Sequence, residues 1–394
     1  MKIPEIITHL TDTDAYTINM SRVYFYRFSD VVGEMKFICR TPNIEFTPEM
    51  VEEIRKQVGY LCKLQYTDDE LNFVRSISYH KDAVGFLEFL RFFKFNEKFI
   101  EIKQGGPCGL EIRAKGPMWT ICALEVHVLS IVNEVYFRMK YYQNYDDLFV
   151  NLLYRLRTKA EEFSKRPFSI TEFGTRRRFS KEAQSYVIKT MKDTMGSYLA
   201  GTSNVYFAMQ NGLKPMGTFA HQYVCTPQGL DDCAPRNSQR YAWDQWCREY
   251  RGNLGIALTD TLGQRKFEVD FDRYWANMFT GLRHDSGDPF EWGERAIKIY
   301  EGFDIDPRTK TLMFSDSLDF DKAWAIEERF KGRIKTAFGI GTFLTCDTKV
   351  PPLNIVMKLQ KINGKPVAKL SNVPSKTVCE DEEYVERLKK EIVQ

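Results

Sequence analysis

From residue 168 onward the sequence alternates short apolar runs with helix-like segments, and this rhythm leaves few folds open to the chain. Each run is followed by polar residues or glycine, and the seven runs are Phe168–Phe173, Tyr198–Ala200, Pro215–Ala220, Gly255–Leu258, Phe279–Leu282, Thr311–Phe314 and Ile334–Phe338. Strands that alternate with helices predict a parallel sheet with right-handed crossovers. Polar residues after every strand favour a (β/α) barrel, because that end of a barrel carries the active site.

We therefore predict an α/β fold whose main part is a (β/α) barrel over residues 146–349. The barrel should be irregular, because the gap before Pro215 is too short for a complete crossover helix. A doubly wound open sheet is the structural alternative.

The segments on either side of the barrel predict a smaller α/β module. Before the barrel, strand-like runs occupy 34–39, 99–102 and 110–114, and helical periodicity marks 125–139 and 148–156. After it, Leu353–Lys358 and Pro366–Leu370 flank Asn363-Gly364, which is a hairpin signal, and Asp381–Val393 is typical of a helix. We predict that residues 1–145 form this module and that residues 350–394 complete it.

Composition excludes several classes of protein. The 394 residues carry 56 basic and 53 acidic groups, a net charge of +3, which is too balanced for a nucleic-acid binder. The nine cysteines are an odd number without a CxxC pair, so they predict reduced thiols rather than disulfides or a zinc site. The first residues lack a signal-peptide pattern, and no apolar run approaches the roughly 18 residues of a membrane span. The cytoplasm is therefore the expected compartment, with no membrane partner.

Two polar loops in the barrel region could bind anions or a sugar. Gly174-Thr175-Arg176-Arg177-Arg178 combines backbone N–H groups at a helix start with guanidinium groups, which suits phosphate or carboxylate; a solvated basic turn fits the same residues. The segment Arg283–Pro289 places a cation and two carboxylates around a glycine. Asp285 could accept ribose hydroxyls or hold a metal through water, whereas Asp288 could simply cap the next helix.

A phosphate site is predicted at the seventh strand end. Phe338–Thr342 contains Gly339 and Gly341 just where barrels commonly bind phosphate through backbone amides. Ser315-Asp316 occupies the corresponding position one unit earlier.

His221 is one of only five histidines, and it follows the small residues of the third run. A single histidine is more often structural than catalytic. Asp260, at the next strand end, favours the catalytic interpretation because a carboxylate can fix the tautomer of an imidazole and raise its basicity.

Taken together, these segments closely resemble the nicotinate phosphoribosyltransferase family, in its bacterial and fungal branch. The matching motifs run through nearly the whole chain: Thr11–Tyr16, Phe37–Arg40, Glu172–Arg177, Gly201–Asn204, Pro215–His221, Leu282–Pro289 and Gly364–Lys369. Because several of these motifs are long and occur in order, the resemblance is specific.

The resemblance implies a reaction. Nicotinate would attack the anomeric carbon of 5-phosphoribosyl 1-pyrophosphate and release pyrophosphate, with ATP hydrolysis coupled through a phosphohistidine. His221 would be that histidine, with Asp260 and Asp285 beside it. The sequence holds no direct metal motif, but Mg²⁺ is expected with the pyrophosphate.

The resemblance also implies the binding residues. Phe173 and Tyr16 would sandwich the pyridine ring, with Tyr16 supplied by the other subunit of a homodimer; core packing is the alternative for both. The remaining assignments are Arg176, Thr202 and Ser203 at the substrate, Arg283 with Asp285 at the ribose, Ser315, Asp316, Gly339 and Gly341 near the 5′-phosphate, and Arg40 and Lys358 at pyrophosphate across the subunit interface.

Nicotinate should be preferred to nicotinamide, because related nicotinamide enzymes carry an acidic residue where this chain has Ser203. Two other functions remain open. A sugar-phosphate isomerase or lyase would share the phosphate site but need no ATP. A non-catalytic metabolite sensor is the other, although the presence together of His221, Asp260, Arg283 and Asp285 argues against it.

Overall fold

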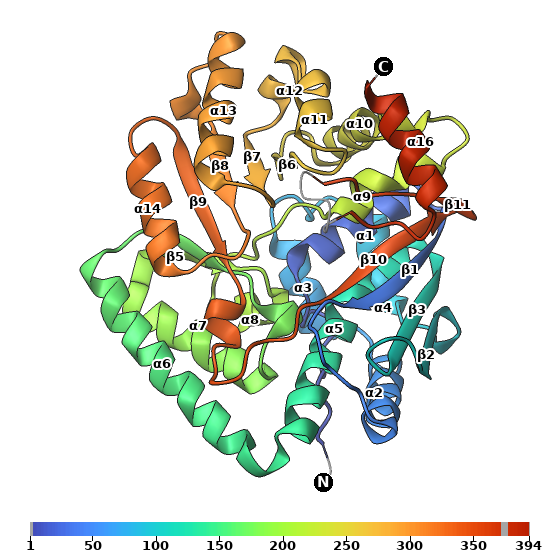
Figure 1. Cartoon of the computed structure of the whole chain (residues 1–394), viewed down its shortest axis with the longest axis vertical. Coiled ribbons are helices and arrows are strands. Elements are labelled where there is room, and N and C mark those ends of the chain that lie inside the picture. Colours follow the sequence, from blue (N-terminus) through green and yellow to red (C-terminus); the bar gives the residue numbers. More distant parts are fainter. Residues whose placement is uncertain (1–2, 372–376, 394) are drawn as a thin grey trace. The chain divides into compact units, whose positions relative to one another are not determined.

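The structure is a computed structural model that describes residues 3–371 and 377–393 (Figure 1). The chain divides into two compact units. Unit 1 comprises residues 1–30, 35–217 and 340–357, and unit 2 comprises residues 31–34, 218–339 and 358–394. The predicted boundaries of the barrel and the smaller module stay a prediction.

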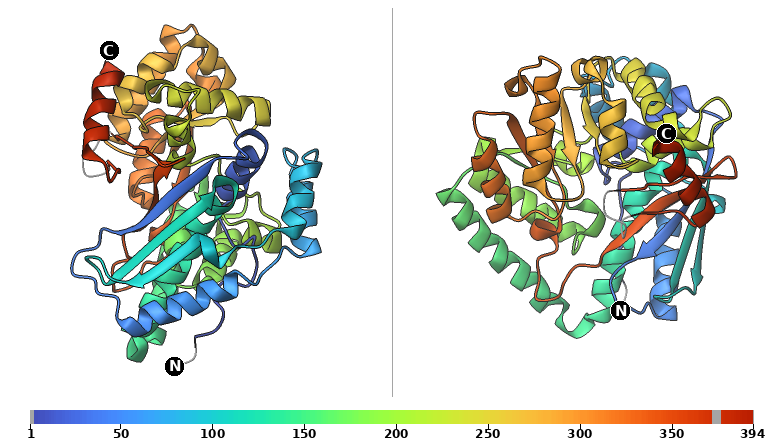
Figure 2. Two further views of the ribbon diagram at one scale, coloured as in Figure 1. Left: turned by 90° about the vertical axis from the view of Figure 1, so that its right-hand side faces the viewer. Right: turned by 45° about the horizontal axis from the view of Figure 1, so that its top comes forward.

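Unit 1 is mainly helical and also contains two small groups of strands. Its helices are α1 (Ala15–Arg27), α2 (Pro48–Leu61), α3 (Asp68–Ser76), α4 (Val84–Phe92), α5 (Met118–Lys140), α6 (Tyr145–Lys165), α7 (Lys181–Met195), α8 (Val205–Asn211) and α15 (Thr342–Thr345). Its strands are most of β1 (Val32–Cys39), β2 (Ile100–Gln104), β3 (Leu110–Pro117), β4 (Ile170–Glu172) and β5 (Leu199–Thr202). β2 and β3 form an antiparallel pair with Ile100 opposite Ala114 (Figure 2).

Helix α5 forms the centre of unit 1. Nearly every side chain from Met118 to Phe137 is buried, and α1 and α2 pack against this helix. By length and composition α5 could cross a membrane, which corrects the expectation that no segment is apolar enough. Its whole apolar stretch is buried inside the protein, as in a core helix.

A parallel strand pair positions the functional loops of unit 1. β4 and β5 run parallel, with Glu172 opposite Thr202, so the residues that follow both strands emerge at one edge. The amide of Phe173 donates to the carbonyl of Ile340, the last residue of β9 (Lys335–Ile340), at 2.8 Å. Helix α7 begins where the Ser180 hydroxyl accepts a hydrogen bond from the Ala183 amide, and it packs along α6 (Figure 1).

Unit 2 contains the regular βα repeat. Its strands are β6 (Ile256–Leu258), β7 (Gly281–His284), β8 (Thr311–Phe314), most of β9, most of β10 (Ile355–Ile362) and β11 (Lys365–Pro366). Its helices are α9 (His221–Cys225), α10 (Ser238–Tyr250), α11 (Gln264–Asp270), α12 (Arg273–Met278), α13 (Pro289–Gly302), α14 (Phe320–Phe330) and α16 (Glu382–Val393).

Strands β6, β7, β8 and β9 pair in parallel and in sequence order, which confirms the α/β class (Figure 1). Helix α13 packs against β7 and α14. It begins at Asp288, whose carboxylate accepts from the amides of Phe290 and Glu291, with Pro289 in the first turn. Asp288 is therefore a helix cap. These pairings are consistent with the predicted barrel.

The prediction of a third strand at Pro215–Ala220 is wrong. Only a single bridge between Pro215 and Thr202 forms there. Pro215 has no N–H to donate, and Gly217 has a φ of +148°, so the segment cannot continue as a strand.

The predicted hairpin is confirmed in unit 2. β10 and β11 pair antiparallel with Ile362 opposite Lys365, and Asn363 and Gly364 turn with φ of +50° and +78°. The second strand is shorter than predicted, because Ala368 exchanges hydrogen bonds with the side chain of Gln228 instead of extending the ladder.

Candidate active site

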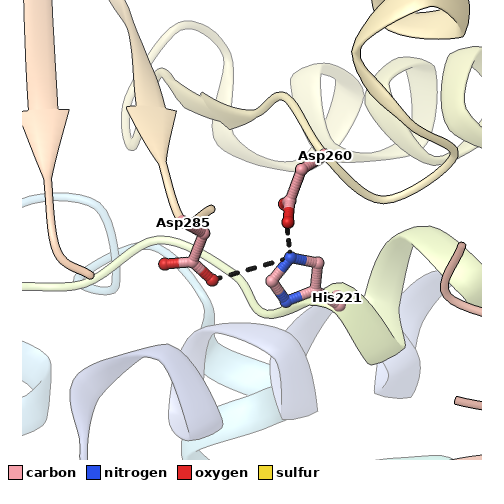
Figure 3. A group of neighbouring side chains, drawn as sticks. All are labelled: His221, Asp260 and Asp285. Atoms are coloured by element: carbon pink, nitrogen blue, oxygen red, sulfur yellow. Dashed lines mark hydrogen bonds and ion pairs between the residues drawn. The ribbon is translucent and has the colours of Figure 1, made fainter. Parts of the chain in front are cut away.

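Three residues predicted from separate motifs meet in unit 2 (Figure 3). His221 is the first residue of α9, Asp260 follows β6, and Asp285 follows β7. The Nε2 atom of His221 lies 2.7 Å from Asp260 Oδ1 and 3.6 Å from Asp285 Oδ2. Because β6 and β7 are parallel neighbours, their carboxyl ends bring both carboxylates to one imidazole.

The second oxygen of Asp260 binds residues that the sequence interpretation did not single out. Lys369 Nζ lies 2.9 Å from Asp260 Oδ2, and the Ser286 hydroxyl donates to the same oxygen at 2.9 Å. Both Lys369 and Asp260 are largely buried. A lysine inside the apolar segment Val367–Leu370 was the available signal, because a buried ammonium needs a carboxylate.

These contacts set the protonation states. Burial, assisted by the positive charge of Lys369, lowers the pKa of His221 to about 4, so its imidazole is neutral near pH 7. Burial would raise the pKa of Asp260, but the hydrogen bond from His221 and the charge of Lys369 hold it well below its usual range. Asp260 is therefore ionised and accepts the Nε2 proton of His221. The Nδ1 atom has no hydrogen-bond partner in residues 3–371 and 377–393, and its lone pair is available.

Arg283 and Ser315 complete this cluster. The guanidinium of Arg283 donates to the carbonyl of Phe219 at 3.1 Å and lies 3.6 Å from Asp285 Oδ2. Its Nε atom is buried with no hydrogen-bond partner among the described residues. The Ser315 hydroxyl donates to Asp285 Oδ1 at 3.0 Å. Burial opposes ionisation of Asp285, but the charge of Arg283 outweighs it and lowers the pKa of that carboxyl.

In unit 1, backbone hydrogen bonds bring the N-terminal motif to the end of β5. The amide of Ala15 donates to the carbonyl of Ser203, and the amides of Val205 and Tyr206 donate to the carbonyls of Thr13 and Thr11. Residues 11–15 and 203–206 therefore lie side by side.

Tyr16 and Arg176 both contact Glu125 of the same chain. The Tyr16 hydroxyl donates to Glu125 Oε2 at 3.3 Å, and Arg176 Nη1 lies 3.5 Å from Glu125 Oε1. Glu125 is a buried carboxylate in the apolar helix α5, and that contrast was the missed signal. Tyr16 thus lies beside Arg176 of its own chain. The assignment of Tyr16 to the site of the partner subunit stays a prediction.

The hydroxyls of Thr202 and Ser203 already have protein partners. Ser203 donates to Asp14 Oδ1 at 2.6 Å, and Thr202 donates to Glu172 Oε2 at 2.5 Å. Burial raises the pKa of Asp14, although the charge of Arg176 opposes the change. The hydroxyl proton of Ser203 is therefore donated to Asp14, and not to a substrate, while this contact persists.

The other residues predicted to bind substrate or phosphate lie in both units. In unit 1, Phe173 and Tyr16 are only partly buried, which disfavours simple core packing, and Gly341 precedes the short helix α15. Arg40 follows β1, and its amide donates to the carbonyl of Asn354. In unit 2, three of the predicted residues lie on or after strands, namely Asp316 after β8, Gly339 on β9 and Lys358 on β10.

The donor set around His221 was tested for a metal. Ligand atoms of His221, Asp260 and Asp285 all lie within 4.8 Å of one another. Asp260 is already neutralised by Lys369, and Mg²⁺ prefers oxygen ligands. Asp285 is the partly exposed, ionised carboxylate, so it is the residue that fits a hydrated Mg²⁺.

Comparisons with known proteins identify the family of this chain. The model of the nicotinate phosphoribosyltransferase (NAPRTase) family matches residues 168–394, and the model of its N-terminal domain matches residues 11–133. The chain belongs to the nicotinate phosphoribosyltransferase family. It is 45% identical over 390 residues to the nicotinate phosphoribosyltransferase of Burkholderia mallei, covering 98% of this chain and 96% of the relative. The enzyme of Cupriavidus necator is 45% identical over 389 residues, covering 98% and 97%.

Solved structures show the same fold. The nicotinate phosphoribosyltransferase of Vibrio cholerae aligns with a TM-score of 0.92 at 38% identity, covering 99% of this chain and 94% of that one. The enzyme of Porphyromonas gingivalis aligns with a TM-score of 0.91 at 33% identity, covering 99% and 100%.

Proposed function

We propose that this protein is a nicotinate phosphoribosyltransferase that consumes ATP. It would convert nicotinate, 5-phosphoribosyl 1-pyrophosphate, ATP and water to nicotinate mononucleotide, pyrophosphate, ADP and phosphate, a ligase-class reaction of NAD biosynthesis. Family membership supports the substrates. The ion-paired arrangement of Lys369, Asp260 and His221 is the observation that supports the coupling to ATP.

In the phosphoryl step His221 is the nucleophile. Its Nδ1 lone pair forms a bond to the γ-phosphorus of ATP while the bond to the bridging oxygen breaks, and ADP leaves. Asp260 accepts the Nε2 proton in a hydrogen bond and stabilises the positive charge that develops on the ring. Water later hydrolyses the phosphohistidine. Mg²⁺ beside Asp285 would neutralise phosphate charge when bound.

In the transfer step the pyridine nitrogen bonds to the anomeric carbon as the bond to pyrophosphate breaks. The nucleophile loses no proton, so no general base is needed. Arg283 is proposed to bind anionic oxygens of the donor, since its guanidinium lies beside Asp285 and His221. Arg40, Lys358, Ser315, Asp316, Gly339 and Gly341 are proposed to bind the phosphate groups, and Tyr16 and Phe173 the pyridine ring.

The proposal is tested by pyrophosphate release with the purified chain. Release should require both nicotinate and the phosphoribosyl donor, and ATP should increase it. An isomerase or lyase would release none, and neither would a sensor. Absence of nicotinate-dependent release from folded protein would refute the proposal.

Phosphorylation of His221 should be insensitive to mild acid. Because its pKa is lowered to about 4, the imidazole keeps its lone pair until the pH approaches that value. Labelling with ATP carrying a γ-phosphorus tracer should give constant phosphoenzyme from about pH 8 to about pH 6 and a decline only below, whereas an ordinary histidine titrates near 6.5. A midpoint near the ordinary value would contradict the neutral, buried imidazole.

The Ser203→Asp variant should lose nicotinate affinity. A carboxylate there would face Asp14 and the substrate's own carboxylate, and two like charges about 4 Å apart repel by about 4 kcal/mol at an effective dielectric near 20. The matched variant Ser203→Asn adds a side chain of the same shape without charge, so it should retain most of the affinity. Equal KM values for nicotinate in the two variants would exclude charge as the cause.

Tyr16 should serve the site of the partner subunit, as the family resemblance implies. In that case, mixing Tyr16→Ala with His221→Ala should partly recover activity, because a hybrid dimer regains one intact site. No recovery after verified subunit exchange would count against a shared site. The control mixes each variant with wild-type chain.

A further inference from the structure

One buried carboxylate of unit 1 joins the two loops that we propose to bind nicotinate. The first loop follows β4 and carries Phe173 and Arg176, and the second lies at the end of β5 and carries Ser203. We propose that Glu172 is a positioning residue that holds these two loops in the arrangement that recognises a pyridine carboxylate. The inference rests on the proposed function and adds a specificity determinant to it.

Glu172 fixes the first loop through three hydrogen bonds from two donor groups. The amide of Gly174 donates to Glu172 Oε1, and the side-chain amide of Gln184 donates to both carboxylate oxygens at 3.1 Å. The same Gln184 amide contacts the Thr175 hydroxyl at 3.0 Å. Gly174 is therefore hydrogen-bonded to the Glu172 carboxylate, and Thr175 is hydrogen-bonded to Gln184 of α7.

Glu172 fixes the second loop through its side chain and its backbone. The Thr202 hydroxyl donates to Oε2 at 2.5 Å, and the amide of Ser203 donates to the carbonyl of Glu172 at 2.8 Å. Thr202 Oγ1 in turn accepts from the amide of Asn204 at 3.1 Å. A change at the carboxylate thus reaches the backbone on both sides of Ser203.

The contacts argue for positioning and against a direct role with substrate. Glu172 has an exposed fraction of 0%, and both of its oxygens accept protein donors. No face of the carboxylate is left for a ligand. Burying a carboxylate is costly unless it is hydrogen-bonded, so loss of one of these partners should rearrange the loops.

The same contacts predict a pH dependence. All three side-chain and amide partners donate, so they suit the ionised carboxylate. Burial raises the pKa of Glu172 to about 7, and the neighbouring charge of Asp14 adds to this effect. The other charged groups nearby are the paired Asp12 and Arg178. Nicotinate binding should therefore weaken as the pH falls through 7, because protonated Glu172 no longer accepts from every donor.

The experiment measures KM for nicotinate, KM for the phosphoribosyl donor and kcat between about pH 6 and about pH 8. Glu172→Gln should raise KM for nicotinate about tenfold near pH 7.5, with the donor KM and kcat changed less than about twofold. Its nicotinate KM should also lose the pH dependence of the wild type. Glu182→Gln, an exposed change on the helix that carries Gln184, is the matched control and should behave as wild type.

Thr202→Val breaks the same link from the other loop and keeps the side-chain shape. It should raise the nicotinate KM similarly. Combining it with Glu172→Gln should add little, because both variants disrupt the same hydrogen bond between Thr202 and Glu172. If Glu172→Gln does not fold, Thr202→Val decides the question. An unchanged nicotinate KM, or an equal loss in all three constants, overturns the inference. Absence of synthesis by the wild type would instead refute the proposed function.

Discussion

The His221→Ala variant should form no acid-labile phosphoenzyme and show no nicotinate-dependent ATP hydrolysis, yet retain slow, ATP-independent synthesis of nicotinate mononucleotide. The imidazole is neutral, and its Nε2 proton is donated to ionised Asp260, so Nδ1 is the proposed nucleophile that the substitution removes. Glycosyl transfer itself moves no proton from nicotinate, so its residual rate should survive. The measurement is labelled phosphate on the protein, alongside product formation with and without ATP.

The matched control is His9→Ala, which removes a partly exposed histidine of unit 1. It should keep both the label and the ATP dependence. Labelled phosphate that persists on the His221→Ala chain would disprove the assignment of His221 as the phosphorylated residue. Complete loss of synthesis in a folded variant would mean that His221 also serves the transfer step.

Replacing Arg178 by Met should destabilise unit 1 by about 3–5 kcal/mol, because it leaves Asp12 as a buried charge without its main partner. Arg178 Nη1 and Nη2 lie 2.6 and 2.9 Å from the two Asp12 oxygens, and both side chains have an exposed fraction of 0%. Burial would raise the pKa of Asp12, but the charge of Arg178 lowers it well below its usual range. The pair's contribution should therefore be constant at neutral pH and be lost only in strong acid.

Arg177→Met is the natural comparison, since it changes the adjacent, partly exposed arginine. Its contact with Asn354 is exposed, so the expected loss is about 0–1 kcal/mol. Denaturant unfolding of both variants gives the two free energies. Equal stabilities would show that the Asp12–Arg178 pair contributes no more than a surface contact.

These three consecutive arginines show where sequence interpretation stops. The run Arg176-Arg177-Arg178 suggested one anion site or one solvated turn. In the fold, Arg176 lies beside Glu125, Arg177 contacts Asn354 at the surface, and Arg178 is fully buried against Asp12. Within one turn the three side chains point in different directions. Only tertiary packing decides which of them is buried.

The site around His221 was more predictable. Strand ends of a parallel sheet meet at one edge, so the βα rhythm could place Asp260 near His221, and the family resemblance added Asp285. Lys369 could not, because it comes from the tail after the hairpin, whose course depends on the hydrogen bonds between Ala368 and Gln228. Likewise Glu125 and Glu172 act through buried contacts with residues far apart in sequence, which no local pattern reports.

Regular elements were predicted best where local chemistry is strong. Helix α13 begins at Asp288 and Pro289 as a capped helix should, and Asn363-Gly364 turns the hairpin. The strand predicted at Pro215–Ala220 does not form. We gave its apolar composition more weight than Pro215, which has no N–H, and Gly217, which can adopt a positive φ.

We propose that this chain joins nicotinate to a phosphoribosyl group at the expense of ATP. Mass spectrometry can identify the product formed from nicotinate, 5-phosphoribosyl 1-pyrophosphate and ATP, with pyrophosphate and ADP measured in the same samples. We expect nicotinate mononucleotide and pyrophosphate in equal amounts, and continued release of ADP only when nicotinate and the phosphoribosyl donor are both present. Pyrophosphate without the mononucleotide, or a mononucleotide made equally well from nicotinamide, would contradict it.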